Sequence, residues 1–67
     1  MKLRLFEYVI LLHEYNESKQ LTNTSIVVDV TLKLAVDEQT VKMYAARQIP
    51  SELENQLNNV EILVRQF

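Results

Sequence analysis

The stretch Phe6–Leu12, with the sequence FEYVILL, decides how this chain can fold. Side chains of a β-strand point alternately to the two faces of a sheet. As a strand, the segment carries Phe6, Tyr8, Ile10 and Leu12 on one face and Leu3, Leu5, Val9 and Leu11 on the other, with Glu7 as the charged exception. A strand with two apolar faces is typical of the centre of a sheet, where both faces are covered. A chain this short has few helices or strands that could pack on both faces. We therefore expect a second copy or another protein to cover one of them.

Length and composition limit how the chain can be stabilised. We expect its 67 residues, 1–67, to form a single domain. A core of this size supplies only about 3–5 kcal/mol unless a disulfide, a metal or oligomerisation adds to it. The sequence has no cysteine and one histidine, which excludes a disulfide and a thiolate site and does not support structural zinc. We therefore expect no cofactor and no metal, and a homo-oligomer, most simply a dimer.

The charged residues are scattered singly, with seven basic and nine acidic side chains and a net charge of −2. No basic stripe is present for a phosphate backbone, so we expect no nucleic-acid partner. The basic residues before the apolar run suggest a signal peptide, but Glu7 interrupts the run and no small-residue cleavage site follows. No stretch reaches the length of about 20 apolar residues needed to span a membrane. We expect a cytoplasmic protein with no membrane contact.

Glycine is absent from the chain. This excludes a glycine-rich phosphate loop, a dinucleotide fingerprint and a nucleophile elbow. No Ser, Thr or Lys stands in a recognisable nucleophile context, so we expect no enzymatic activity. Backbone positions with positive φ should fall to Asn or Asp, and Asn16, Asn23, Asn58 and Asn59 stand where turns are expected.

Two strands are predicted in the first half of the chain. The first runs from Lys2 to about His13, and the polar stretch Tyr15–Thr24 follows as a long mobile hairpin loop. In the next segment, apolar residues fill every even position: Ile26, Val28, Val30, Leu32, Leu34 and Val36. Such alternation over twelve residues indicates a half-buried antiparallel strand.

A helix is predicted over about Glu38–Gln48. Asp37 is a suitable N-cap, and Val41, Tyr44 and Ala45 mark the apolar side of the helix. The helix should end before Pro50, because proline disfavours the α conformation of the residue that precedes it.

A second, shorter helix is predicted over Glu52–Leu57, with Leu53 and Leu57 directed inward. Ser51 and Glu54 fit the pattern of a capping box at its start. The alternating segment Val60–Gln66 then indicates the last strand.

The order β-β-α-β predicts an α+β fold with a three-stranded antiparallel sheet. A hairpin joins the first two strands, and a helical crossover lets the third strand lie beside the first, in the order 2-1-3. The helices then cover one face only, and the sequence does not decide which set of side chains faces them. The uncovered face has Leu3, Leu5, Val9, Leu11, Val27 and Leu63 as its candidate interface residues, with a contribution from Ala35. Large exposed apolar patches mark interaction sites.

Polar clusters give weaker signals. His13 with Glu14 and Glu17 resembles a metal or acid–base cluster, although a lone histidine near a strand end needs no such role. Glu7 and Asp29 form a close carboxylate pair in one interpretation; in the other, they face solvent or pair with Arg4, Lys33 or Arg65.

Several short motifs are spread along the chain: Phe6–Tyr8, Val28–Val30, Ala45–Pro50, the Glu52-Leu53-Glu54 segment with Leu57, and the closing Val60–Phe67. In these motifs, which cover most of its length, the chain resembles a group of small tailed-bacteriophage proteins. Members carry proline before the final phenylalanine, where this chain has Gln66. The resemblance implies a viral context and a small accessory role, and it implies no site residues.

The expected function is therefore contact. The first hypothesis is a non-enzymatic, homodimeric phage accessory protein in the host cytoplasm that binds a host or viral protein. The alternative is a virion structural or assembly component. A small enzyme or ligand-binding domain at a dimer interface lacks converging polar groups, and a nucleic-acid binder lacks the charge.

Overall fold

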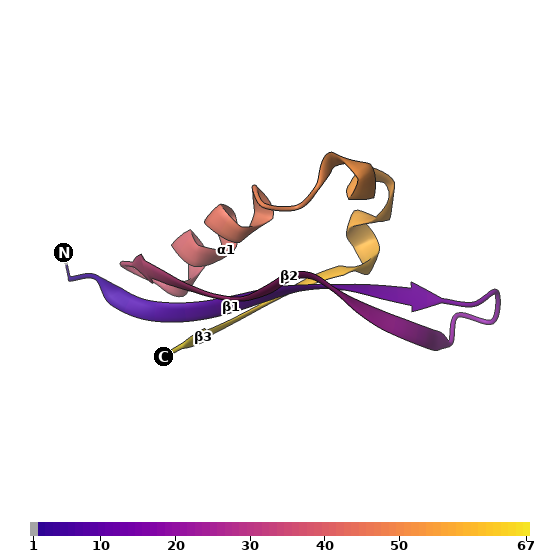
Figure 1. Cartoon of the computed structure of the whole chain (residues 1–67), viewed down its shortest axis with the longest axis horizontal. Helices are drawn as coiled ribbons and strands as arrows, with labels where there is room; N and C mark the ends of the chain where they lie inside the picture. Colours follow the sequence, from indigo (N-terminus) through magenta and orange to yellow (C-terminus); the bar gives the residue numbers. More distant parts are fainter. Residues whose placement is uncertain (1) are drawn as a thin grey trace.

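The structure is a computed structural model that describes residues 2–67, and it has one sheet and one helical layer (Figure 1). The elements are β1 (Arg4–Tyr15), β2 (Leu21–Ala35), α1 (Glu38–Ala46), the 3₁₀ helix η1 (Ser51–Asn59) and β3 (Val60–Gln66). The sheet order is β2-β1-β3, and β1 is antiparallel to both neighbours. The predicted α+β fold, the strand order and the bounds of the last strand are confirmed.

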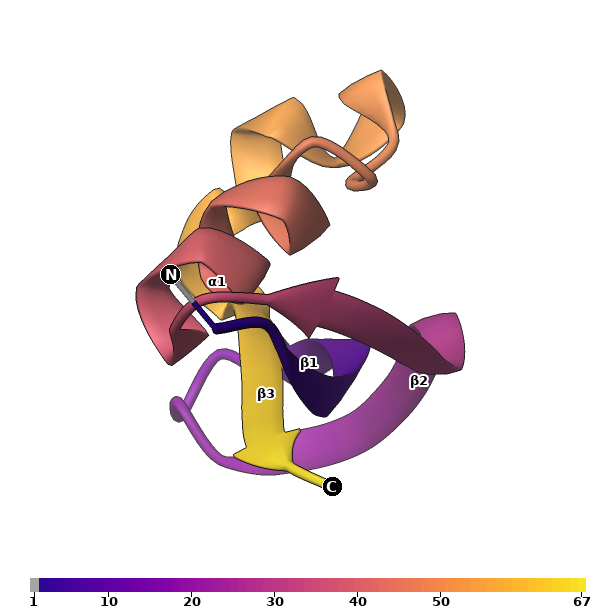
Figure 2. The same cartoon turned by 90° about the vertical axis from the view of Figure 1, so that its left-hand side faces the viewer.

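Both helices lie on the same side of the sheet, and no element of residues 2–67 covers the opposite face (Figures 1 and 2). The molecule is elongated, with extents of 47 × 21 × 16 Å. The length comes from the β1–β2 hairpin, because β3 pairs only with Phe6–Leu12, whereas pairing between β1 and β2 continues to Tyr15 and Leu21. The end of the hairpin is thus a two-stranded ribbon that projects beyond the sheet.

The core lies between β1 and α1. Its buried residues are Phe6, Tyr8, Ile10, Ala35, Val41 and Ala45. The even-numbered side chains of β1 therefore face the helix, and Ile10 and Val41 are fully buried. This settles the choice between the two faces of β1 that the sequence left open.

Helix α1 begins at the predicted cap. Asp37 Oδ1 accepts hydrogen bonds from the Thr40 backbone N–H at 2.8 Å and from the Thr40 hydroxyl at 2.7 Å. These bonds, the side-chain bond foremost, lower the pKa of the Asp37 carboxyl below its usual value. The helix ends at Ala46, before the predicted Gln48, because the chain tightens into i→i−3 bonds at Arg47, Gln48 and Ile49 ahead of Pro50.

The second helix differs from its prediction. η1 is a 3₁₀ helix interrupted at Gln56, and its start has no side-chain cap, so the predicted capping box of Ser51 and Glu54 is wrong. The Pro50 carbonyl instead accepts from the Leu53 N–H at 3.0 Å, which closes a 3₁₀ turn. Leu57, predicted to point inward, is half exposed.

The hairpin loop is shorter than predicted, because the strands run on to Tyr15 and resume at Leu21. Asn16 organises the turn, since its Oδ1 accepts from the Ser18 and Gln20 N–H groups, both at 2.9 Å. Within residues 2–67 the positive φ falls on Lys19, at 62°, and not on an Asn or Asp. The prediction that positive φ falls to Asn or Asp is therefore wrong for this turn, which Asn16 serves through its side chain and not through its backbone.

The pairing of β2 with β1 has register irregularities that decide where its side chains point. Tyr8 is opposite Thr31 but Ile10 is opposite Val28, and the next pair is Leu11 with Ile26. Extra residues on one strand change which face the following side chains occupy. As a result Val27 and Val28 both pack against the core, so the expected position of Val27 on the uncovered face is wrong.

Candidate interaction surface

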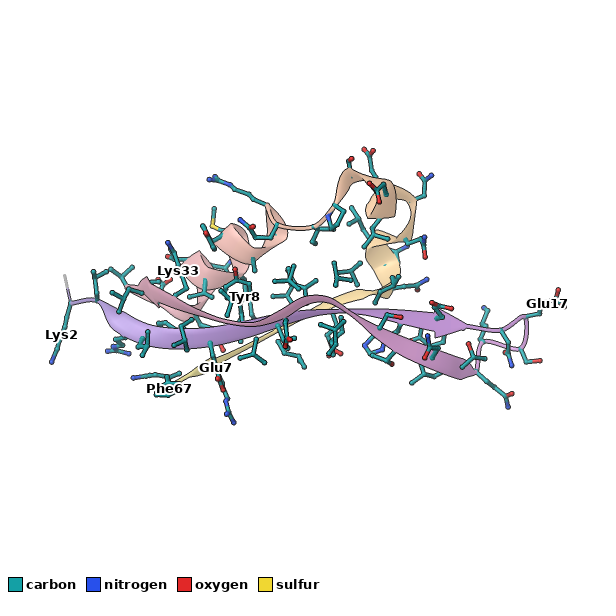
Figure 3. All side chains as sticks on the ribbon, viewed as in Figure 1. Lys2, Glu7, Tyr8, Glu17, Lys33 and Phe67 are labelled. Atoms are coloured by element: carbon teal, nitrogen blue, oxygen red, sulfur yellow. The ribbon has the colours of Figure 1, made fainter. Side chains whose placement is uncertain are left out.

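The candidate site is the sheet surface opposite the helices, which we call the open face. Its side chains lie in rows across β3, β1 and β2, placed by the strand register and by a bond from the Phe67 N–H to the Leu5 carbonyl at 2.9 Å. The rows are Phe67, Leu5 and Leu34; Arg65, Glu7 and Leu32; Leu63 and Val9, with Val30 beside them around a common hollow; and Glu61, Leu11 and Ile26. Figure 3 shows Glu7 directed to this side, whereas Tyr8 and Lys33 point towards the helices.

The edge strand β2 contributes an apolar column to the open face. Ile26, Val30, Leu32 and Leu34 are 63, 60, 53 and 56% exposed. A strand normally turns such residues inward, and here each leaves more than half of its surface in water. Contiguous exposed apolar residues of this kind mark an interaction surface.

The residues proposed from the sequence divide into two groups. Leu5, Val9, Leu11 and Leu63 lie on the open face, and Leu3 lies exposed directly before β1. Val27 packs against the core and Ala35 is buried in it, so neither contributes to this surface.

Sequence reasoning missed the apolar column of β2 and also Phe67. The signal was present, since the even-numbered apolar residues of β2 had been recognised as one set. They were left out of the candidate interface residues because nothing in the alternation says whether a set faces the helix or the open side.

Two pairs of polar side chains lie among the apolar rows. Arg65 Nε donates to Glu7 Oε1, which joins β3 to β1. Farther along, His13 Nε2 lies 2.8 Å from Glu61 Oε1, and His13 Nδ1 lies 2.9 Å from Thr24 Oγ1. Since a carboxylate only accepts, Nε2 carries the proton in this bond. The pairs tie the three strands together.

The alternative interpretations of the polar residues can now be compared with the geometry. Glu7 pairs with Arg65, and Asp29 Oδ1 accepts from the Val30 N–H at 2.7 Å, so the two carboxylates do not form a pair. Residues 2–67 contain no group of three or more His, Cys, Asp or Glu side chains arranged to hold a metal ion. His13 instead bridges two strands.

A shallow hollow of about 300 Å³ lies at the middle of the open face. Its walls are mainly apolar, with the Glu7–Arg65 pair at one end. It is lined by Glu7, Tyr8, Val9, Val30, Leu63, Val64 and Arg65. A hollow with these walls suits an inserted aliphatic side chain.

The opposite face is occupied by the chain's own side chains. Tyr8 and Tyr44 meet edge to face with ring centroids 6.2 Å apart, and the Lys33 ammonium lies 4.2 Å from the Tyr44 ring centre. Helix α1 is thus fastened to β1 and β2 by aromatic and cation–π contacts.

Within residues 2–67, neither helix has the length and apolar character required to cross a bilayer. Comparison with family models, curated proteins and solved structures finds no match to this chain.

Proposed function

We propose that this protein is a non-enzymatic interaction module that works through its open face, with a second copy of the chain as its first partner. The supporting observation is the exposed apolar column of β2 beside the apolar residues of β1. A chain of 67 residues has a small core, and oligomerisation is the stabilisation that remains without cysteine.

The proposal also fits the extent of the open face. Its four rows, from Leu5 to Leu11, are about 20 Å long, and three strands span about 10–14 Å. Each face is thus a patch of a few hundred Å², the size of the apolar patches that mark interaction sites.

Size-exclusion chromatography with light scattering tests the proposal directly. We expect a dimer of the 7.9 kDa chain at tens of micromolar. A monomer at that concentration rejects the homodimer.

Matched variants locate the contact. Leu32→Lys on the open face should dissociate the dimer, whereas Met43→Lys on the helix side should not, although the two native side chains are similarly exposed, at 53 and 57%. Circular dichroism of both variants checks that the fold is kept. Equal loss of the dimer in both would place the contact elsewhere.

The biological role we propose is that of a viral accessory protein in the host cytoplasm, on the strength of the resemblance to small phage proteins. The dimer would then bind a host or viral protein. Mass spectrometry of purified virions separates this role from that of a structural component, because abundant copies in the particle would reject the accessory role.

A further inference from the structure

We infer that two copies stack their open faces in antiparallel orientation, about a two-fold axis that crosses the strands at Val9 and Leu63. Arg65 of each copy then pairs with Glu61 of the other. The inference rests on the proposed function and adds the geometry of the partner to it.

The order of side chains on β3 carries the inference. Arg65 and Glu61 lie on either side of Leu63 on the open face, each two residues or about 7 Å away. A two-fold axis across the strands at Leu63 reverses this order in the second copy. Arg65 therefore faces Glu61 of the second copy, and the same pair forms again at the symmetric position.

Both groups have bonding capacity left for this contact. Arg65 is 80% exposed in its side chain and is bonded to Glu7 only through Nε, so its two terminal nitrogens have no acidic partner among residues 2–67. Glu61 is bonded to His13 through Oε1, and Oε2 has no partner in the same part of the chain. An Arg65–Glu61 pair between the copies would join the Glu7–Arg65 contact of one copy to the Glu61–His13 contact of the other.

Three other symmetric arrangements place like charges together. An axis along β1 sets Glu7 over Glu7 and Arg65 over Leu32. An axis across the strands at the Glu7 row sets Arg65 over Arg65, and one at the Leu11 row sets Glu61 over Glu61. Like charges brought together in an interface are strongly disfavoured. The axis at Val9 and Leu63 avoids all of these contacts.

The apolar residues fit the same axis. Leu32 faces Ile26 of the second copy, and Leu63 and Val9 face their own counterparts at the hollow of about 300 Å³. Packed sheets keep their strands within about 30° of each other, at a distance of about 10 Å. The long Arg65 side chain spans the lateral offset that this twist produces.

A charge-reversal experiment tests the pairing. Arg65→Glu and Glu61→Arg should each weaken self-association at least about tenfold, because each sets two pairs of like charges at the interface. An equimolar mixture of the two variants should form heterodimers well above the statistical half, since every facing pair is then complementary. Native mass spectrometry measures the fraction. Arg47→Glu, on the helix side, is the control for the change of charge and should leave self-association unchanged.

Cysteine cross-linking tests the axis independently, and the native chain has no cysteine to interfere. Leu63→Cys should be joined to its counterpart by a short bismaleimide, whereas Leu5→Cys should not, because Leu5 faces His13 of the second copy. An axis along β1 would instead predict a cross-link at position 5 and none at position 63.

The outcomes separate the two proposals. A dimer that gives statistical mixing and links at position 5 but not at position 63 overturns the antiparallel stack and leaves the proposed function standing. A monomer under the light-scattering conditions overturns both.

Discussion

The Lys33 ammonium lies over the Tyr44 ring, 4.2 Å from its centre, and thereby connects the edge strand β2 to helix α1. Lysine in the interior-facing row of an apolar sheet would otherwise be costly, but its stem packs along the sheet while its charge meets the negative face of the ring. The contact explains how a charged residue occupies the helix side of β2 opposite Phe6.

The contact between Lys33 and Tyr44 should be measurable as a coupling. A double-mutant cycle with Lys33→Met and Tyr44→Leu should give a coupling free energy of about 0.5–1 kcal/mol in urea denaturation. The two single variants serve as the internal controls of the cycle. If the effects of the two substitutions on the free energy of unfolding are additive, the two side chains lie close together without stabilising each other.

The stability contributed by the Asp37 cap should depend on pH. The pKa of Asp37 is lowered in the folded state, so its contribution is present above the unfolded pKa and is lost as pH falls through the folded pKa. Asp37→Asn keeps a good N-cap but does not titrate. The native chain should therefore be the more stable at about pH 6, and the difference should vanish at about pH 2. Thermal unfolding of both proteins at each pH checks this, and a constant difference would contradict it.

Because Ile10 is buried and Ile26 is exposed, the loss of one methylene group should destabilise the protein more at position 10 than at position 26. Ile10→Val removes it at a fully buried position and should lower the free energy of unfolding by about 0.5–1.5 kcal/mol. Ile26→Val makes the same change at a side chain that is 63% exposed, and should cost less than about 0.5 kcal/mol in the monomer. Chemical denaturation at low protein concentration compares them. A larger loss of stability in Ile26→Val than in Ile10→Val would mean that the odd-numbered side chains of β1, and not the even-numbered ones, face the helix.

The turn at Lys19 predicts opposite effects of two substitutions. A side chain with a Cβ is disfavoured at φ 62°, so Lys19→Gly should raise the free energy of unfolding by up to about 1 kcal/mol. Lys19→Val should lower it, because a β-branched residue is least tolerant of positive φ. Equal stability of the two variants would show that the turn adopts another backbone.

The sequence predicts most of the architecture because its strongest signals are local. The run Phe6–Leu12 identifies the central strand, the alternation from Ile26 to Val36 identifies its neighbour, and Asp37 marks the start of the helix. Proline at position 50 separates the two helical segments as expected. These features depend on neighbours within a few residues.

The open face could be predicted only in part, because it depends on register. The bulged residues of β2 bring Val27 and Val28 to the same side and leave Ile26 on the other. Simple alternation cannot show such a change. The pairs Glu7–Arg65 and His13–Glu61 join residues far apart in sequence, so local patterns indicate only that suitable polar side chains are present.

The irregular pairing of β2 has a consequence for solubility. β2 and β3 are both edge strands, and a straight edge offers a row of backbone donors and acceptors to which further chains can add without limit. Bulges bend and twist an edge and so interrupt this row. In β2 they lie beside the largest exposed apolar column of the molecule, where fibre-like growth would be most damaging. The bulges thus protect the free edge of β2 beside its exposed apolar side chains, where the open-ended addition of further strands would otherwise begin.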